Sequence, residues 1–543
     1  MKKHAKQIFW NTLLLTVAGL FIRTVGVGFQ VYLSNRVGAE AMGLFSLMSG
    51  VYGFALTFAT SGIYLGVTHL VVDALGKKQP ERIAPAMRRA ILYALSFGTA
   101  AFLLLYGFAR PIGILWLKDE RTVTSLRLFG ISLPLISLSS VFSGYFSAVR
   151  RSFKNAAVQV FEQAVKIGFT VYLLAFLFPH DIEKTCCAMV LGGVLAEVVS
   201  FFCNFLLYLA DRKRYTKSGR SRLESHEGKR LIKIALPVAI TAYIRSALVT
   251  VEHVLIPEGL RNSGSSHQTA LIAYGSIQSM ALPIIFYPAA LISSFAGLIV
   301  PEIAECHVEK STRRIAYMLS RVWWIASLFS IGVAGILICF SFEIGDALYP
   351  GTEAGKYIRM LAPLIPIMYV DTATDAVMKG LGEQIFSMNI NIADALISVV
   401  MVWLLIPRFG IAGYLVTIYF SEIFNTVLSI WHLLSITSPH LRLFKWVAAP
   451  LLSILGATYA VRLLLLKSSC LFANRGLSIF IHIAAVFALY FLLLRMLGGI
   501  DREDMKWIGS LFTKESRQRS VDGEPATTGR LKNHRNSLRN WRP

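Results

Sequence analysis

The sequence predicts an all-α protein that crosses a membrane many times. Hydrophobic residues make up 55% of the 543 positions and charged residues only 16%, whereas soluble globular proteins carry about 25% charged residues. The mean hydropathy is +0.58. Apolar stretches of about eighteen residues or more, each long enough to cross a hydrocarbon core of about 30 Å, recur along the whole chain. This pattern predicts a polytopic helical membrane protein.

Each apolar stretch predicts one transmembrane helix. Charged and polar segments divide the stretches into about fourteen spans. They are expected near residues 8–34, 44–72, 86–110, 122–149, 155–178, 186–210, 231–256, 270–300, 316–341, 357–380, 385–407, 410–436, 443–466 and 476–497. The first twelve form two sets of six, and the last two are additional helices.

Positive charge is distributed unevenly between the segments that join the spans. Lys and Arg gather in alternate segments such as DRKRYTKSGRSR at 211–222, while segments such as IGDALYPGTEAG at 344–355 have none. The positive-inside rule makes the rich segments cytoplasmic, so both termini are expected inside. The net charge of +23 therefore favours contact with anionic lipids of the inner leaflet over binding of nucleic acid.

The longest interior basic segment separates two halves in which similar features follow in the same order. Arg23 and Arg245 lie in the opening spans of the two halves, and the fourth span of each half ends near a glycine, Gly144 or Gly380. Two such bundles would be related by a pseudo-two-fold axis along the membrane normal. The predicted organisation is an N-terminal six-helix lobe (1–210), a cytoplasmic basic linker (211–229), a C-terminal six-helix lobe (230–440), two additional transmembrane helices (441–498) and a disordered basic cytoplasmic tail (499–543).

Each half opens with a helix that carries a polar stripe centred on one arginine. A charged residue at the bilayer centre costs about 2.5–3.5 kcal/mol, so such a residue usually has a function. If both stripes face one cavity, the two guanidiniums suit a diphosphate, because arginine offers a planar fork of donors to phosphate oxygens. The structural alternative is an arginine paired with an acid or with helix carbonyls. The candidate substrate-binding residues are Arg23 and Gln30 in the first half, and Arg245, Thr241, Glu252 and His253 in the second.

Four stretches carry a resemblance to a known family. They are RTVG at 23–26, VGAEAMGLFSL at 37–47, SGIYLGVTHLVVDALGKKQPERIAPAMRRA at 61–90 and ALPIIFYPAALISSFAGLIVPEIAE at 281–305. In order and spacing they resemble the oligosaccharide-lipid flippase superfamily (multidrug/oligosaccharidyl-lipid/polysaccharide exporters). Within it they resemble the branch of the stage V sporulation protein B, polysaccharide biosynthesis proteins and lipid II flippases.

The resemblance implies a fold and a function. The fold would be two six-helix lobes in a V, with two extra helices that form a groove for a lipid tail. The function would be alternating-access transfer of a polyprenyl-pyrophosphate-linked saccharide or peptidoglycan precursor from the inner to the outer leaflet. This transfer would serve envelope, spore-cortex or polysaccharide biosynthesis in the bacterial plasma membrane.

Two other functions stay open. A cation-coupled multidrug exporter of the same superfamily is expected to place a carboxylate in its first span, where this chain has Arg23. A membrane scaffold of the envelope-synthesis machinery would need neither arginine. An enzyme acting on the same lipids is not expected, because the external segments are too short for a catalytic domain. The six cysteines show no metal-ligand spacing, so neither cofactor nor metal is expected. Transport coupled to a proton or a sodium ion stays open, and the sequence assigns no residue to bind that ion.

Overall fold

The computed structural model describes residues 2–176, 181–212, 226–439, 442–468, 475–501 and 504–505. These residues form helices joined by short turns and contain no β-strand. Twelve helices in this part of the chain are long and apolar enough to cross a membrane. The predicted all-α, polytopic membrane fold is therefore confirmed, whereas the number of about fourteen spans stays a prediction.

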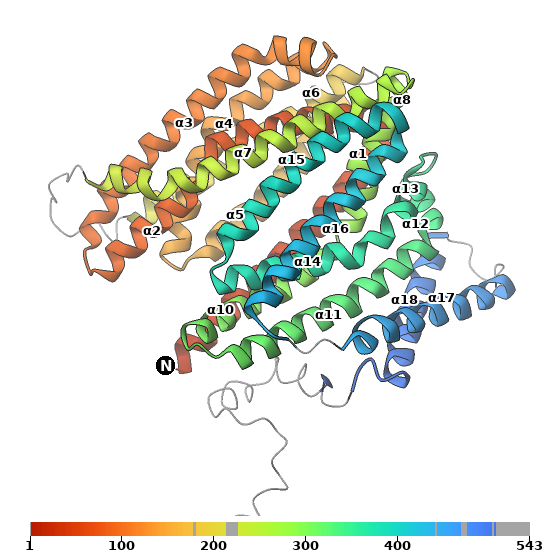
Figure 1. Ribbon diagram of the computed structural model, residues 1–543. Helices are drawn as coiled ribbons and strands as arrows, with labels where there is room; N and C mark the ends of the chain where they lie inside the picture. The colour runs from red at the N-terminus through yellow and green to blue at the C-terminus, as the bar shows by residue number, and fades with distance from the viewer. Residues whose placement is uncertain are drawn as a thin grey trace, which may run out of the picture.

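The first group of helices packs into one bundle, here called the N-terminal lobe. Helices α3 and α4 form its outer flank, and α1 and α2 line the side that meets the rest of the molecule (Figure 1). The elements are α1 (Lys2–Thr60), α2 (Ile63–Gly76), η1 (Pro80–Arg82), α3 (Ile83–Pro111), η2 (Ile112–Trp116), α4 (Thr122–Ala148), α5 (Ser152–Phe176) and α6 (Ile182–Arg212).

Helix α1 consists of two helical arms that meet at Gly38, in agreement with the expected break between the first two spans. The backbone at Gly38 is not helical, with φ of 83° and ψ of 169°. An L-residue with a side chain rarely adopts this φ, so glycine fits the bend. The polar segment around Gly38 is therefore an elbow between the two arms, and the second arm ends at Thr60, before the expected end of the span at residue 72.

The second group of helices forms the C-terminal lobe. Helix α15 packs against α7 and α16, and α14 packs against α10, α11 and α16. The elements are α7 (His226–Asn262), α8 (His267–Gly275), η3 (Ser276–Ala281), α9 (Leu282–Phe286), α10 (Ala289–Val308), α11 (Thr312–Cys339), α12 (Ser341–Leu348), α13 (Ala354–Leu361), η4 (Ala362–Leu364), α14 (Ile365–Leu381), α15 (Gln384–Phe409) and α16 (Ile411–Ile436). The expected span near 270–300 is thus divided between α8, η3, α9 and α10.

The last helices of the described residues form a pair on the flank opposite α3 and α4 (Figure 1). This pair consists of η5 (Phe444–Ala448) with α17 (Ala449–Ser468), and α18 (Arg475–Met496). It packs against α11 of the C-terminal lobe. The buried Trp324 of α11 donates a hydrogen bond from Nε1 to the Gly499 carbonyl oxygen at 3.2 Å, which fixes the end of α18 to this lobe.

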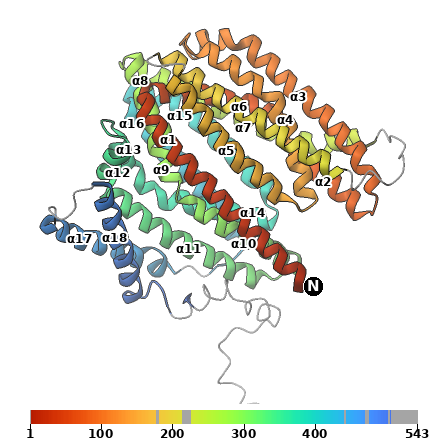
Figure 2. The same cartoon turned by 180° about the vertical axis from the view of Figure 1, so that it is seen from behind.

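The two lobes meet along α1. Seen from behind, α1 crosses the molecule from the N-terminus to α8 (Figure 2). Its second arm packs against α7 and α8, and one apolar core contains Leu47 of α1, Ile256 of α7 and Leu271 of α8. The lobes therefore share a packed boundary that contains the first candidate arginine helix.

Candidate translocation site

Arg23 lies on the first arm of α1 and is exposed. Its guanidinium is within electrostatic range of Tyr369 on α14, a helix of the C-terminal lobe. The neighbouring Thr24 Oγ1 is 2.9 Å from the hydroxyl of Tyr287, which lies between α9 and α10. Among the described residues, no carboxylate lies within ion-pair distance of Arg23. The first arginine thus sits at the boundary between the lobes as a cation without an acidic partner there.

Arg245 lies on α7 and is also exposed. It is within electrostatic range of Asp394 on α15, whose Oδ1 accepts a hydrogen bond from Ser421 at 2.7 Å. Glu252 lies on the same face of α7, and its Oε1 accepts a hydrogen bond from Ser398 of α15 at 2.7 Å. The second stripe therefore follows α15 within its own lobe, and its arginine has an acidic neighbour where Arg23 has none.

The other two residues of the second stripe have separate contacts. The hydroxyl of Thr241 donates to the Pro237 carbonyl of its own helix at 3.5 Å. The Nδ1 atom of His253 lies 2.8 Å from the hydroxyl oxygen of Tyr274 on α8, and the His253 side chain packs on Gly50 of α1. Within the described chain, no hydrogen bond or ion pair joins the first stripe to the second.

Gln30 joins the lobes through a helix irregularity. Its Nε2 donates to the carbonyl oxygen of Ser279 at 2.8 Å. Ser279 belongs to the π-helical η3, four residues before Pro283. Pro283 has no N–H to donate to the Ser279 carbonyl through the i+4 bond of an α-helix, and the Gln30 amide of the other lobe donates to this oxygen.

Two glycines that the sequence analysis did not single out bring the lobes into close contact beside this bond. A Cβ on Gly43 of α1 would lie 2.1 Å from the Leu271 carbonyl oxygen, and one on Gly275 of α8 would lie 2.4 Å from the Ala39 carbonyl oxygen. Helices in membranes approach this closely only through small residues. The glycine at each position is therefore required by the crossing of α1 and α8.

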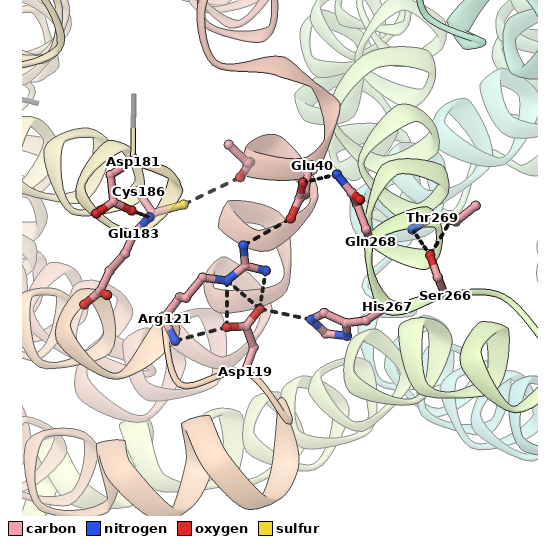
Figure 3. A network of polar contacts seen from close by, with 11 residues as sticks. Glu40, Asp119, Arg121, Asp181, Glu183, Cys186, Ser266, His267, Gln268 and Thr269 are labelled. Carbon is pink, nitrogen blue, oxygen red and sulfur yellow. Dashed lines mark hydrogen bonds and ion pairs between the residues drawn. The ribbon is translucent and has the colours of Figure 1, made fainter. Parts of the chain in front are cut away.

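A polar network lies at the end of the molecule where α8 begins (Figure 3). It consists of Glu40, Asp119, Arg121, His267 and Gln268. Arg121 donates to both carboxylates, with Nη2 2.7 Å from Asp119 Oδ2 and Nη1 3.1 Å from Glu40 Oε1. From the C-terminal lobe, His267 Nε2 lies 3.0 Å from Asp119 Oδ2, and Gln268 Nε2 donates to Glu40 Oε2 at 2.9 Å. None of these five residues was predicted as a site residue from the sequence.

Asp119 is the centre of the polar network. Burial alone would raise the pKa of this carboxyl, but hydrogen bonds from Arg121 and His267 hold it below its ordinary value. The Asp119 carboxylate in turn raises the pKa of the Arg121 guanidinium, with a smaller contribution from Glu40. Next to the network, Lys118 of the N-terminal lobe forms an ion pair with Glu258 of α7. The lobes are thus joined at this end by ionised groups.

These contacts define a helical membrane protein of two interlocked bundles, with a cation where the bundles meet that has no acidic partner among the described residues. Residues 8–265 match the family described as "Polysaccharide biosynthesis protein", and residues 263–404 match the MatE family. These matches confirm the resemblance to the multidrug/oligosaccharidyl-lipid/polysaccharide exporter superfamily that the sequence motifs predict.

Three known proteins illustrate the similarity. The chain is 27% identical over 439 residues to stage V sporulation protein B of Bacillus subtilis (strain 168), which covers 78% of this chain and 83% of the relative. The structure of lipid II flippase MurJ in an inward closed conformation matches with a TM-score of 0.67 and 13% identity, covering 89% of this chain and 98% of that one. An inward-facing multidrug resistance MATE family transporter matches with a TM-score of 0.60 and 12% identity, covering 78% and 99%. At these identities the two solved structures establish the fold.

Proposed function

We propose that the protein is a flippase that moves a polyprenyl-pyrophosphate-linked saccharide or peptidoglycan precursor from the inner to the outer leaflet by alternating access. It would act in a bacterial plasma membrane with both termini in the cytoplasm, and no bond would be made or broken. The similarity to stage V sporulation protein B over 78% of this chain and the fold shared with lipid II flippase MurJ support this proposal.

One observation carries the proposal: Arg23 is exposed at the lobe boundary and has no described acidic partner. A structural intramembrane arginine is normally paired with a carboxylate or with backbone carbonyls. A diphosphate headgroup between the lobes would supply the missing negative charge through charge-assisted hydrogen bonds to the guanidinium. Arg245 would contribute the second cation, shared with Asp394 until the headgroup arrives.

The test is transport of a fluorescent polyprenyl diphosphate saccharide in proteoliposomes. Arg23→Ala should reduce flipping at least about a hundredfold, because loss of a charge-assisted contact to a phosphate removes about 3 kcal/mol. Arg23→Lys should retain part of the activity. Arg36→Ala is the matched control, since Arg36 is an exposed arginine of the same helix near the elbow. Wild-type flipping by Arg23→Ala would refute the role of this residue.

A second function is supported by a different observation, the carboxylates of the C-terminal lobe. Asp371 on α14 lies within electrostatic range of Asp375 on the same helix, of Asp394 on α15 and of Glu422 on α16, and Glu422 is also within range of Asp394. Such a group suits proton or sodium coupling in a multidrug exporter, and the MatE match covers three of these four residues. Ion-driven efflux of an amphipathic cation that survives Arg23→Ala would favour this function over lipid flipping.

A further inference from the structure

The polar network joins segments of the two lobes. Asp119 and Arg121 lie in the turn before α4, and Glu40 lies just after the elbow of α1, all in the N-terminal lobe. His267 and Gln268 begin α8 in the C-terminal lobe. The bonds from His267 to Asp119 and from Gln268 to Glu40 therefore cross between the lobes, whereas those of Arg121 stay within one lobe.

The charges of the network do not balance while His267 is neutral. Glu40 and Asp119 contribute −2 and Arg121 contributes +1, so the network carries −1. The adjacent pair of Lys118 and Glu258 is neutral in sum. Protonation of His267 brings the network to zero and turns its contact with Asp119 into an ion pair. Both groups are partly or fully shielded from water, with 34% and 5% of their side chains exposed, which strengthens the added attraction.

Two other carboxylates near this end add no positive charge to the network. Glu183 of α6 accepts a hydrogen bond from Thr124 and adds a further negative charge on the N-terminal side. Glu258 is engaged by Lys118. His267 is therefore the group of the network whose protonation would bring its charge to zero.

We infer that Asp119 and His267 form a proton-sensitive latch that holds the two lobes together at this end of the molecule. The alternation of basic segments assigns this end to the outside. Acid on that side would protonate His267, hold the lobes closed and slow the outward opening; neutral or alkaline medium would weaken the contact and let the lobes part. The inference rests on the lobe movement of the proposed transport function, but its test requires no substrate.

The test measures the distance between the lobes by pulsed electron paramagnetic resonance in lipid nanodiscs. Spin labels are placed at Glu120 and Arg408, exposed residues of the two lobes at this end, after replacement of the six native cysteines. In the otherwise unchanged protein, the ratio of closed to open lobes should rise about fivefold from about pH 8 to about pH 5.5, as expected for one added ion pair.

Three variants decide between the latch and a passive contact. His267→Gln keeps a hydrogen-bond donor without a charge and should lose the pH response. His267→Lys is always charged and should stay closed at both pH values. His432→Gln is the matched control, because His432 contacts Glu383 at the opposite end of α15 and α16 and should leave the response intact. A pH response in His267→Gln equal to that of the unchanged protein would overturn the inference, as would a response in His267→Lys.

Discussion

The hydrogen bond from Gln30 to the Ser279 carbonyl predicts how strongly one side chain holds the lobes together. Ser279 is 1% exposed, and Pro283, four residues further on, has no N–H to donate to its carbonyl. Gln30→Leu keeps a side chain of similar size and removes the donor. A buried acceptor without a partner costs about 1–3 kcal/mol. With about 1.5 kcal/mol lost in the closed arrangement, the ratio of closed to open lobes should fall about tenfold.

The matched control for Gln30→Leu is Gln278→Leu. Gln278 Nε2 donates to the Tyr414 hydroxyl at 3.0 Å, and both residues belong to the C-terminal lobe. Its loss should lower the free energy of unfolding by a similar amount without changing the distance between the lobes. Pulsed electron paramagnetic resonance gives that distance, and thermal unfolding gives the stability. An unchanged distance distribution in Gln30→Leu would refute the reasoning, and so would an equal shift in Gln278→Leu.

Two further changes test the packing and the ion pairs. Gly275→Ala places a Cβ 2.4 Å from the Ala39 carbonyl oxygen, so α1 and α8 must separate. The free energy of unfolding should therefore fall by about 1–3 kcal/mol in a thermal unfolding assay. Gly297→Ala is the control and should change the stability little, because a Cβ there meets nothing within 4 Å. Burial raises the pKa of the Asp504 carboxyl, but the hydrogen bond from Lys445 helps to hold this pKa below its ordinary value of 3.8. The ionised Asp504 therefore stabilises the folded state above that pH, and this stabilisation is lost as the pH falls through the folded-state pKa. Asp504→Asn should therefore be less stable than the unchanged protein at about pH 6, and the difference should shrink towards about pH 3; a constant difference in unfolding temperature would contradict this.

The helices were predictable because their cause is local. Long apolar stretches between charged segments have only one stable form in a bilayer, so composition and spacing suffice. The break at Gly38 was predictable because the polar residues around it are typical of a turn, whereas the extension of both helical arms up to this one residue was not predicted. The irregularity at Ser279 was signalled only by Pro283, which predicts a freed carbonyl but not the residue that binds it.

The candidate site was less predictable because its contacts join distant parts of the chain. Arg23 stood out as a charge within an apolar helix, and its position at the lobe boundary agrees with that reasoning, while its role in binding stays a prediction. Gln30 shares the face of Arg23, yet it binds a carbonyl 249 positions away. Asp119 and His267 are separated by 148 positions, and each lies in a short polar turn that resembles any other connection. No spacing rule relates such residues before the lobes are assembled.

The bend at Gly38 divides α1 into two arms that meet at a single residue with a non-helical backbone. The first arm carries Arg23, and the second carries Gly43 into its close crossing with α8. If α8 slides along the second arm, the displacement is transmitted through the pivot to the first arm, so Arg23 moves with it. Opening of the lobes at one end of the molecule and displacement of the Arg23 cation would then result from the same rotation of α1.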